Sequence, residues 1–253
     1  RILVATDLST RSDRALRRAT LIARSLGASL ALVHVVEGDQ PLRMIRAERA
    51  EAASVLGDMV RSIREYDGVP ADYQVVVDDV FRGILWAAEE SGADLIVLGP
   101  HRSRFRDVFV GTTVERVVRR CRLPVLVAVQ PPSTSYERAL LALDFDDSSQ
   151  AAARGAMRMG LFQRTAVTVM HAFDAPALGM MERSMDEPEA LEDYIASERA
   201  LAVGRLREFS EELGLPASHS RVAAIRGTPA RRILGSGAHM KRNLIVLGTR
   251  RKD

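Results

Sequence analysis

Three segments of the chain carry residue types that together suit a nucleotide. Asp7 closes the first apolar run, and Gly99 closes a later one. Gly111 and Thr112 open a helix-like segment, whose free N–H groups and positive dipole end attract phosphate. Thr112 and Thr113 add hydroxyl donors. Together these segments predict a nucleotide site: the carboxylate would bind a base or ribose, the strand end offers open backbone, and the helix start would bind phosphate.

Each of these features also has an ordinary structural interpretation. A strand-end aspartate is often a turn or capping residue, a glycine after a strand is often only a turn, and Gly-Thr before a helix is a common N-cap. The nucleotide interpretation gains weight if the residues converge on one crevice. In an open parallel sheet that crevice lies beyond the carboxyl ends of the strands, where the strand order reverses.

The common motifs of nucleotide-processing catalysis are missing from the sequence. It has no Gly-x4-Gly-Lys-Ser/Thr loop, no Gly-x-Gly-x2-Gly after a strand and no Gly-x-Ser-x-Gly elbow. The five histidines show no metal-ligand spacing. His34 and His171 both end a second strand, which favours a shared packing or turn position over a catalytic base. We therefore predict no catalytic residue and no metal site.

Apolar strands alternate with amphipathic helices throughout the first half of the chain, which is the pattern of an α/β domain. Strands are predicted at 1–7, 29–36, 73–77, 93–99 and 123–129, and helices at about 13–26, 41–66, 83–91 and 112–122. Five strands and four helices in this order predict a doubly wound domain with a five-stranded parallel sheet.

The second half of the chain repeats the first. Arg138–Asp144 aligns with Arg1–Asp7 at an offset of 137, and the same offset pairs His34 with His171. The run Leu95–Gly99 recurs unchanged at an offset of 149, so the second copy has gained about a dozen residues, which we place within 175–193. The chain is thus a tandem duplication of one α/β unit. The predicted organisation is a first domain at 1–130, a linker at 131–137 and a second domain at 138–253.

The second copy stops before the closing elements of the first. The first copy runs another 30 residues past Gly99, whereas the second ends five residues past Gly248. We therefore expect the second domain to be truncated after its fourth strand, with an exposed sheet edge that a protein normally covers. The two domains are expected to pack as an intramolecular pseudo-dimer, and a homodimer is a further expectation.

Composition excludes several classes of protein. With 47% apolar and 27% charged residues, the chain is globular, and 36 basic against 33 acidic residues leave a net charge of +3 that implies no nucleic acid. The single cysteine, Cys121, fits a reducing compartment. No apolar run approaches the ~18 residues of a membrane span. We predict a cytoplasmic protein without a membrane span.

The order and spacing of the segments resemble the universal stress protein family. The resemblance rests on the strand that ends in Asp7, the run Ala93–Gly99, and the helix from Gly111 that leads into Leu123-Pro-Val-Leu-Val127. It covers the whole chain, once per half. It implies tandem Rossmann-like, adenine nucleotide alpha hydrolase-like domains, a stress-response role and, as in the ATP-binding branch of the family, ATP as ligand, with or without magnesium. Very weak ATP hydrolysis is the most that it implies as catalysis.

The resemblance also implies which residues contact the nucleotide. The base and ribose side would be lined by the end of the first strand, adenine would meet backbone groups at the end of the second strand, and the phosphates would face the helix start. The implied residues are, in that order, Ala5, Thr6 and Asp7, then Val35 with Leu98 and Gly99 across the crevice, then Gly111, Thr112, Thr113 and Val114.

The phosphate loop departs from the family pattern, which is Gly-x2-Gly-x9-Gly-Ser/Thr. Arg102 stands at the second glycine, and only eight residues separate it from Gly111. A long side chain obstructs close approach of backbone to phosphate, although the arginine charge can instead contact phosphate oxygens. The alternative prediction is a nucleotide-independent scaffold or a binder of apolar ligands.

Overall fold

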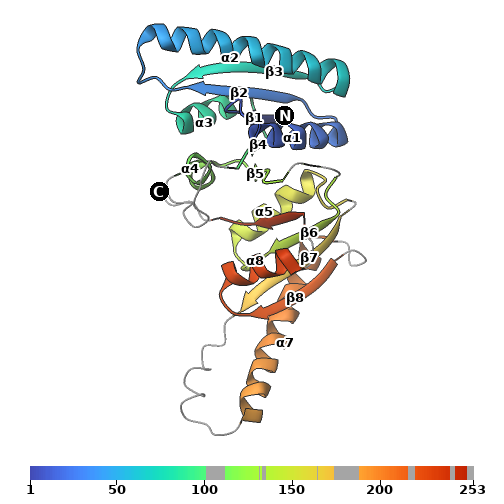
Figure 1. Ribbon diagram of the computed structural model, residues 1–253. Coiled ribbons are helices and arrows are strands. Elements are labelled where there is room, and N and C mark those ends of the chain that lie inside the picture. Colours follow the sequence, from blue (N-terminus) through green and yellow to red (C-terminus); the bar gives the residue numbers. More distant parts are fainter. Residues whose placement is uncertain are drawn as a thin grey trace. The chain divides into compact units, whose positions relative to one another are not determined.

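The computed structural model describes residues 1–100, 112–130, 132, 135–163, 165–173, 188–215, 220–239 and 243–249. The chain divides into two compact units, and the division falls between Ser135 and Tyr136. Of the predicted linker, Pro131, Ser133 and Thr134 lie outside the described residues. Figure 1 shows the elements along the sequence.

The first unit is built on a five-stranded, fully parallel sheet of order β3-β2-β1-β4-β5. The strand order reverses between β1 and β4, because the chain first builds outward through β2 and β3 and then crosses to the other side of β1. The prediction of a doubly wound sheet is confirmed. The strands are β1 (Ile2–Ala5), β2 (Leu30–Val36), β3 (Ala71–Val77), β4 (Leu95–Leu98) and β5 (Val125–Val127).

The helices of this unit pack on both faces of the sheet. One pair is α1 (Ser12–Leu26) and α2 (Leu42–Ser62), which continues as a π-helical turn, η1 (Ile63–Asp67), in contact with α1. The other pair, α3 (Val80–Glu90) and α4 (Thr113–Arg120), is in mutual contact. The predicted helices are thus present, although α3 begins three residues before the predicted start.

Alternate side chains of the sheet form a core with α3 and α4. Leu3, Val33 and Ile96 from three neighbouring strands are fully buried there, and Ala87 of α3 and Val117 of α4 cover them. Burying aliphatic side chains of this size contributes about 1.5–3 kcal/mol each. This core fixes the carboxyl ends of β1, β2 and β4 against the two helices.

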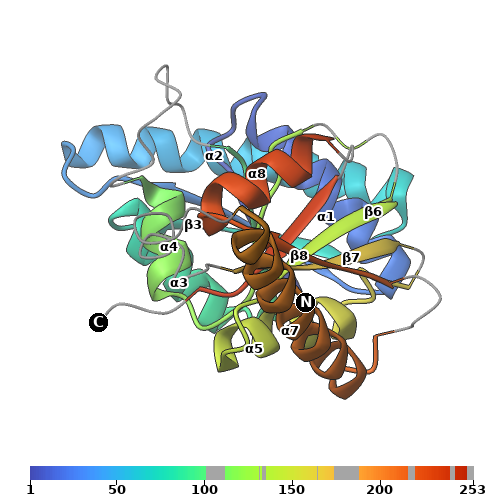
Figure 2. The ribbon, with the colours of Figure 1, turned by 90° about the horizontal axis from the view of Figure 1, so that it is seen from below.

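The second unit has a smaller parallel sheet of order β8-β7-β6-β9. In Figure 2, α8 lies on one side of these strands and α5 on the other. The predicted four-stranded second domain of the same α/β class is confirmed. Its elements are β6 (Arg138–Ala142), α5 (Asp147–Arg158), β7 (Ala166–Phe173), α7 (Pro188–Glu212), β8 (Ser220–Arg226), α8 (Pro229–His239) and β9 (Leu244–Leu247).

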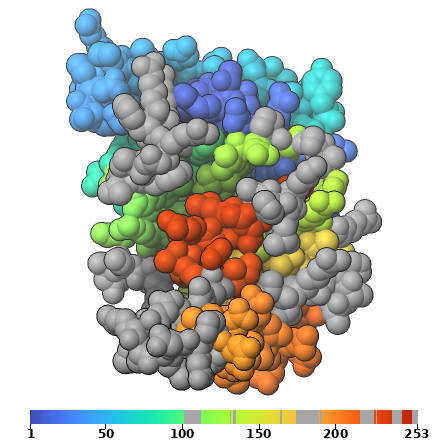
Figure 3. All heavy atoms as spheres, turned by 60° about the horizontal axis from the view of Figure 1, so that its bottom comes forward, coloured from blue at the N-terminus to red at the C-terminus, as the bar shows by residue number. Residues whose placement is uncertain are grey.

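The same tetrapeptide, Leu-Ile-Val-Leu, is fully buried in one unit and half exposed in the other. All four residues of β4 are buried, because β4 lies between β1 and β5. In β9, which is the edge strand among the described residues, Ile245 is 38% and Leu247 48% exposed. Helix α8 also leaves apolar surface to solvent: Leu234 is 69% exposed, and Figure 3 shows this helix in red-orange at the surface.

Helix α3 begins at a capping carboxylate. Asp79 accepts hydrogen bonds from the N–H groups of Phe81 and Arg82 at 3.1 and 3.2 Å, and its second oxygen pairs with Arg116 of α4 at 3.3 Å. Partial burial raises the pKa of Asp79, but these hydrogen bonds and the Arg116 charge outweigh it, so the pKa lies below its ordinary value.

We expect Asp79→Ala to lower the free energy of unfolding of the first unit by about 1 kcal/mol, since an N-cap is lost. Because the pKa of Asp79 is depressed in the folded state, its stabilising contribution is present above the ordinary pKa of aspartate and is lost as pH falls through the folded value. Urea unfolding measures the change. Asp58→Ala, which removes an exposed pair with Arg61, is the control and should change stability by less than about 0.5 kcal/mol. Equal losses in the two variants would contradict the capping role.

No helix in the described part of the chain is long and apolar enough to cross a membrane.

Candidate ligand-binding site

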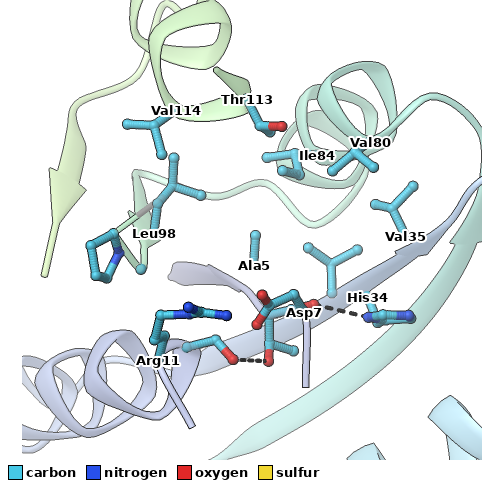
Figure 4. A pocket seen from close by; sticks show the side chains of 15 residues that line it. Ala5, Asp7, Arg11, His34, Val35, Val80, Ile84, Leu98, Thr113 and Val114 are labelled. Carbon is cyan, nitrogen blue, oxygen red and sulfur yellow. Dashed lines mark hydrogen bonds between the residues drawn. The ribbon is translucent and has the colours of Figure 1, made fainter. Parts of the chain in front are cut away.

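A cleft of about 310 Å³ opens at the carboxyl ends of β1, β2 and β4 in the first unit. It lies at the point where the strand order reverses, which is where open α/β sheets bind ligands. Its volume is at the lower end of the roughly 300–1,000 Å³ range of small-molecule sites. Figure 4 shows its side chains converging from strands β1, β2 and β4 and from helices α3 and α4.

Most residues that were predicted to contact a nucleotide line this one cleft. They come from the end of β1, from β2, from the end of β4 and from the first turn of α4, which are far apart in the sequence. The residues are Ala5, Thr6, Asp7, Val35, Leu98, Gly99, Thr113 and Val114. The convergence that the sequence required for a ligand interpretation is therefore present in the geometry.

The other three predicted residues are not among the described residues that line the cleft. Thr112 is buried and does not line the cleft; its hydroxyl accepts the N–H of Glu115 at 3.2 Å, so it is the N-cap of α4. Arg102 and Gly111 lie outside the described residues. The ordinary interpretation of Gly-Thr as a helix cap thus holds for Thr112, while Thr113 faces the cleft.

Seven lining residues were missing from the sequence-based set. The apolar ones form a wall with Val35 and Leu98, while two of the polar ones come from the start of α1 and the third from β2. They are Val33, Val80, Ile84, Pro100, Arg11, Ser12 and His34. Two of them had given a signal, because His34 recurs as His171 and Ser12 as Ser149 at the same offset, and for His34 that signal indicated a shared structural position.

Asp7 is fixed as a carboxylate at the polar end of the cleft. Its Oδ1 accepts the Ser9 N–H at 3.0 Å and the Ser9 hydroxyl at 2.5 Å. Partial burial raises the pKa of Asp7, but the hydrogen bonds from Ser9, with a contribution from Ser12, outweigh it and leave the pKa below its ordinary value. At neutral pH the group is an acceptor, able to bind a ligand hydroxyl or amino group.

Gly99 allows β4 to end against the start of α1. A Cβ at this position would lie 3.3 Å from both the Arg11 carbonyl oxygen and the Ser12 Cα, closer than most side chains tolerate. The counterpart in the second unit is tighter still, since a Cβ at Gly248 would lie 2.5 Å from the Ser148 carbonyl carbon. Both glycines therefore have a packing role, and at Gly99 this role also shapes the floor of the cleft.

A short stretch of unpaired backbone faces the cleft from β2. The Thr6 N–H donates to the Val33 carbonyl at 3.0 Å, while the Asp78 N–H donates to Val36 on the other side of the strand. Residues of β2 therefore alternate between the two neighbouring strands. Val35 would bond on the β1 side, but β1 has ended at Ala5 and no backbone hydrogen bond joins Val35 to the described residues that follow it. Its N–H and C=O are therefore available to the cleft that it lines.

The arrangement suits a flat ligand with both polar and apolar faces. The aliphatic wall offers dispersion contacts, the Val35 backbone offers one N–H and one C=O side by side, and Asp7 offers an ionised acceptor. The described residues contain no group of three or more His, Cys, Asp or Glu side chains placed to hold a metal ion.

Comparison with known proteins gives matches to both halves of the chain. Residues 1–129 and 135–253 each match the model of the universal stress protein family. Universal stress protein A homolog 1 from Coxiella burnetii is 27% identical over 137 residues, which are 49% of this chain and 92% of that protein.

Two solved structures share the fold over nearly the whole chain. A universal stress protein from Archaeoglobus fulgidus superposes with a TM-score of 0.70 at 20% identity, covering 96% of this chain and 85% of that one. A functionally unknown protein from Pseudomonas aeruginosa superposes with a TM-score of 0.64 at 18% identity, covering 96% and 79%. At these identities the likeness concerns the tandem fold alone.

Proposed function

The chain belongs to the universal stress protein family, whose members have a stress-response role, and from this premise we propose that its first unit binds an adenine nucleotide, ATP, in the cleft between β1 and β4. The proposal concerns binding, with little or no catalysis. The single observation that supports it most is the unpaired Val35 backbone beside an aliphatic wall.

The Val35 backbone has the hydrogen-bonding pattern that adenine requires. Adenine presents an amino donor next to a ring-nitrogen acceptor, which is complementary to an adjacent C=O and N–H. Its flat faces would lie between aliphatic side chains such as Ile84 and Leu98, which line the cleft. Buried polar groups that pair with the correct ligand discriminate strongly against ligands that leave them unpaired.

The phosphates would extend toward the start of α4. Thr113 and Val114 are the first two residues of this helix and line the cleft, whereas the N–H of Glu115 is already bound by the Thr112 hydroxyl. The positive end of the helix dipole stabilises phosphate charge there. The proposed contacts from Arg102 and Gly111, and any magnesium ion with the phosphates, remain predictions.

Turnover of the bound nucleotide is expected to be near background. Asp7 is the one carboxylate among the described lining residues, and its Oδ1 is already engaged by Ser9. General-base catalysis requires a group within hydrogen-bond reach of the attacking water and a pKa near the working pH, whereas the pKa of Asp7 is lowered.

Titration calorimetry with ATP and Mg²⁺ tests the proposal. Wild type should bind saturably, and Asp7→Ala should weaken binding at least about tenfold, because a hydrogen bond to a charged group contributes roughly 1.5–3 kcal/mol. Asp144→Ala, the same change at the duplicated position of the second unit, is the matched control and should keep wild-type affinity. Binding that is unaffected in both variants would refute the site assignment.

Absence of saturable binding in wild type would favour the alternative function, a nucleotide-independent scaffold or a protein that binds apolar ligands. The aliphatic wall of the cleft is the feature that would serve such ligands. The pseudo-dimer, the homodimer and the cytoplasmic location stay predictions.

A further inference from the structure

The backbone hydrogen bonds between β1 and β2 stop before Val35, although the register of the two strands would place Val35 opposite Asp7. Ala5 is paired with Val33, and the Thr6 N–H donates to the Val33 carbonyl at 3.0 Å. In a parallel ladder the next bonds would join the Val35 N–H to the Thr6 carbonyl and the Leu8 N–H to the Val35 carbonyl. If these two bonds formed, Val35 would have no backbone group left for a ligand.

Both of the groups that would pair with Val35 are engaged by side chains instead. The Nδ1–H of His34 donates to the Thr6 carbonyl at 2.9 Å, and the Leu8 N–H donates to the Thr6 hydroxyl oxygen at 3.0 Å. Leu8 has a φ of 57°, in the left-handed region, which turns the chain away from β2. Two side chains and one turn thus interrupt the ladder at Val35.

The imidazole is held in this position from its other side as well. His34 is 9% exposed, and its Nε2 lies 3.8 Å from Glu48 Oε1 of α2. The second carboxylate oxygen of Glu48 accepts from the Gln40 amide at 3.2 Å. The ring is therefore fixed between a carbonyl at the end of β1 and a carboxylate on α2, and it also lines the cleft.

The second unit repeats the interruption with different side chains around it. His171 donates from Nδ1 to the Leu143 carbonyl at 2.8 Å, and Phe145, the counterpart of Leu8, has a φ of 54°. Leu143 replaces Thr6 and has no hydroxyl group to accept the following N–H. The imidazole bond to the strand-end carbonyl and the left-handed turn are therefore the elements that both copies share.

We propose that His34 is a positioning residue for the nucleobase: its ring occupies the Thr6 carbonyl and thereby keeps the Val35 N–H and C=O available to the base. The identity of the ligand in this inference rests on the proposed function. The availability of the Val35 N–H and C=O does not depend on it. With leucine at position 34 the Thr6 carbonyl loses its donor and accepts the Val35 N–H, so the ladder closes. With asparagine, the side-chain amide nitrogen takes nearly the place of Nδ1 and the donor is restored.

The test compares wild type, His34→Leu and His34→Asn, with His171→Leu as the matched control in the second unit. ATP and inosine triphosphate are titrated into each, because hypoxanthine presents donor and acceptor in the reverse order. Amide hydrogen exchange at Val35 is followed by NMR without nucleotide. Thermal unfolding of each variant identifies any that fails to fold.

Wild type, His34→Asn and His171→Leu should prefer ATP to inosine triphosphate at least tenfold, with ATP affinities within about threefold of each other. His34→Leu should bind ATP at least tenfold more weakly, lose most of the preference, and show exchange at Val35 slowed at least tenfold. If His34→Leu does not fold, a folded His34→Asn with wild-type exchange and preference supports the proposal, and one that loses both overturns it.

A folded His34→Leu protein with unchanged Val35 amide exchange and unchanged ATP affinity would also overturn the proposal. Equal losses of ATP affinity in His34→Leu and His34→Asn would overturn it as well. Failure of wild type to bind ATP would refute the proposed function. Slowed Val35 exchange in His34→Leu would still support the positioning role in that case, so the two failures are distinguishable.

Discussion

Replacing Gly248 with alanine is expected to lower the free energy of unfolding of the second unit by about 3 kcal/mol or more. The new Cβ would lie 2.5 Å from the carbonyl carbon and oxygen of Ser148 and 2.6 Å from the Ser149 nitrogen. These are backbone atoms at the start of α5, so no side-chain rotation relieves the clash, and the helix must move away from β9. Overpacking that shifts backbone costs about 1–3 kcal/mol and occasionally more.

Urea unfolding with two matched glycine variants measures this effect. Gly99→Ala makes the same change in the first unit, where the nearest atoms lie at 3.3 Å, and should cost only about 1 kcal/mol. Gly204→Ala lies within α7 and has no atom within 4 Å of the new Cβ, so it should stabilise by about 0.5–1 kcal/mol. A Gly248→Ala protein as stable as wild type would show that β9 and α5 do not approach as described.

Filling the cleft from its floor is expected to abolish nucleotide binding. Ala5 ends β1 and its side chain points into the cleft between the wall residues, as Figure 4 shows. A phenylalanine there would take the space that the base requires, and we expect Ala5→Phe to weaken ATP binding at least about 100-fold, the effect of losing roughly 2.7 kcal/mol of contacts. The folded state should persist, because the added ring extends into the cleft and not into the core.

Calorimetric titration beside thermal unfolding checks the expectation. Val77→Phe adds the same side chain at the end of β3, where Val77 is 39% exposed and does not line the cleft, so ATP affinity should stay at the wild-type value. Wild-type affinity in Ala5→Phe would place the nucleotide elsewhere. Unlike Asp7→Ala, the Ala5→Phe variant keeps every polar side chain of the site, so it tests only whether the nucleotide needs the volume of the cleft.

Sequence patterns were sufficient for the elements of the fold but not for all of their ends. Strands such as β2, with seven consecutive buried residues, are unmistakable because a parallel sheet is covered on both faces. The sequence pattern predicts that α3 starts at Gly83, yet the helix begins at Val80 because Asp79 caps it. Capping by a lone aspartate is a local hydrogen bond that hydrophobic periodicity does not report.

The site was predictable where it depends on strand ends and not where it depends on packing between helices and strands. Asp7 and Gly99 were identifiable because topology brings the carboxyl ends of neighbouring strands together. Val80 and Ile84 reach the cleft only through the packing of α3 on β2, which no local pattern encodes. The role of His34 depends on which carbonyl its ring meets, and this is decided by tertiary geometry.

The left-handed turn after the first strand of each unit has a consequence for protein engineering. Leu8 and Phe145 both adopt positive φ although neither is glycine, at a cost of about 1–3 kcal/mol each. Since the duplicated copies kept this backbone while exchanging Thr6 for Leu143 and Arg11 for Ser148, the second unit already has the scaffold geometry of the first at this position. A designer who wants the strand-end part of the cleft in the second unit can begin from side-chain exchanges at this turn, whereas the part that α4 supplies has no counterpart among the described residues of that unit.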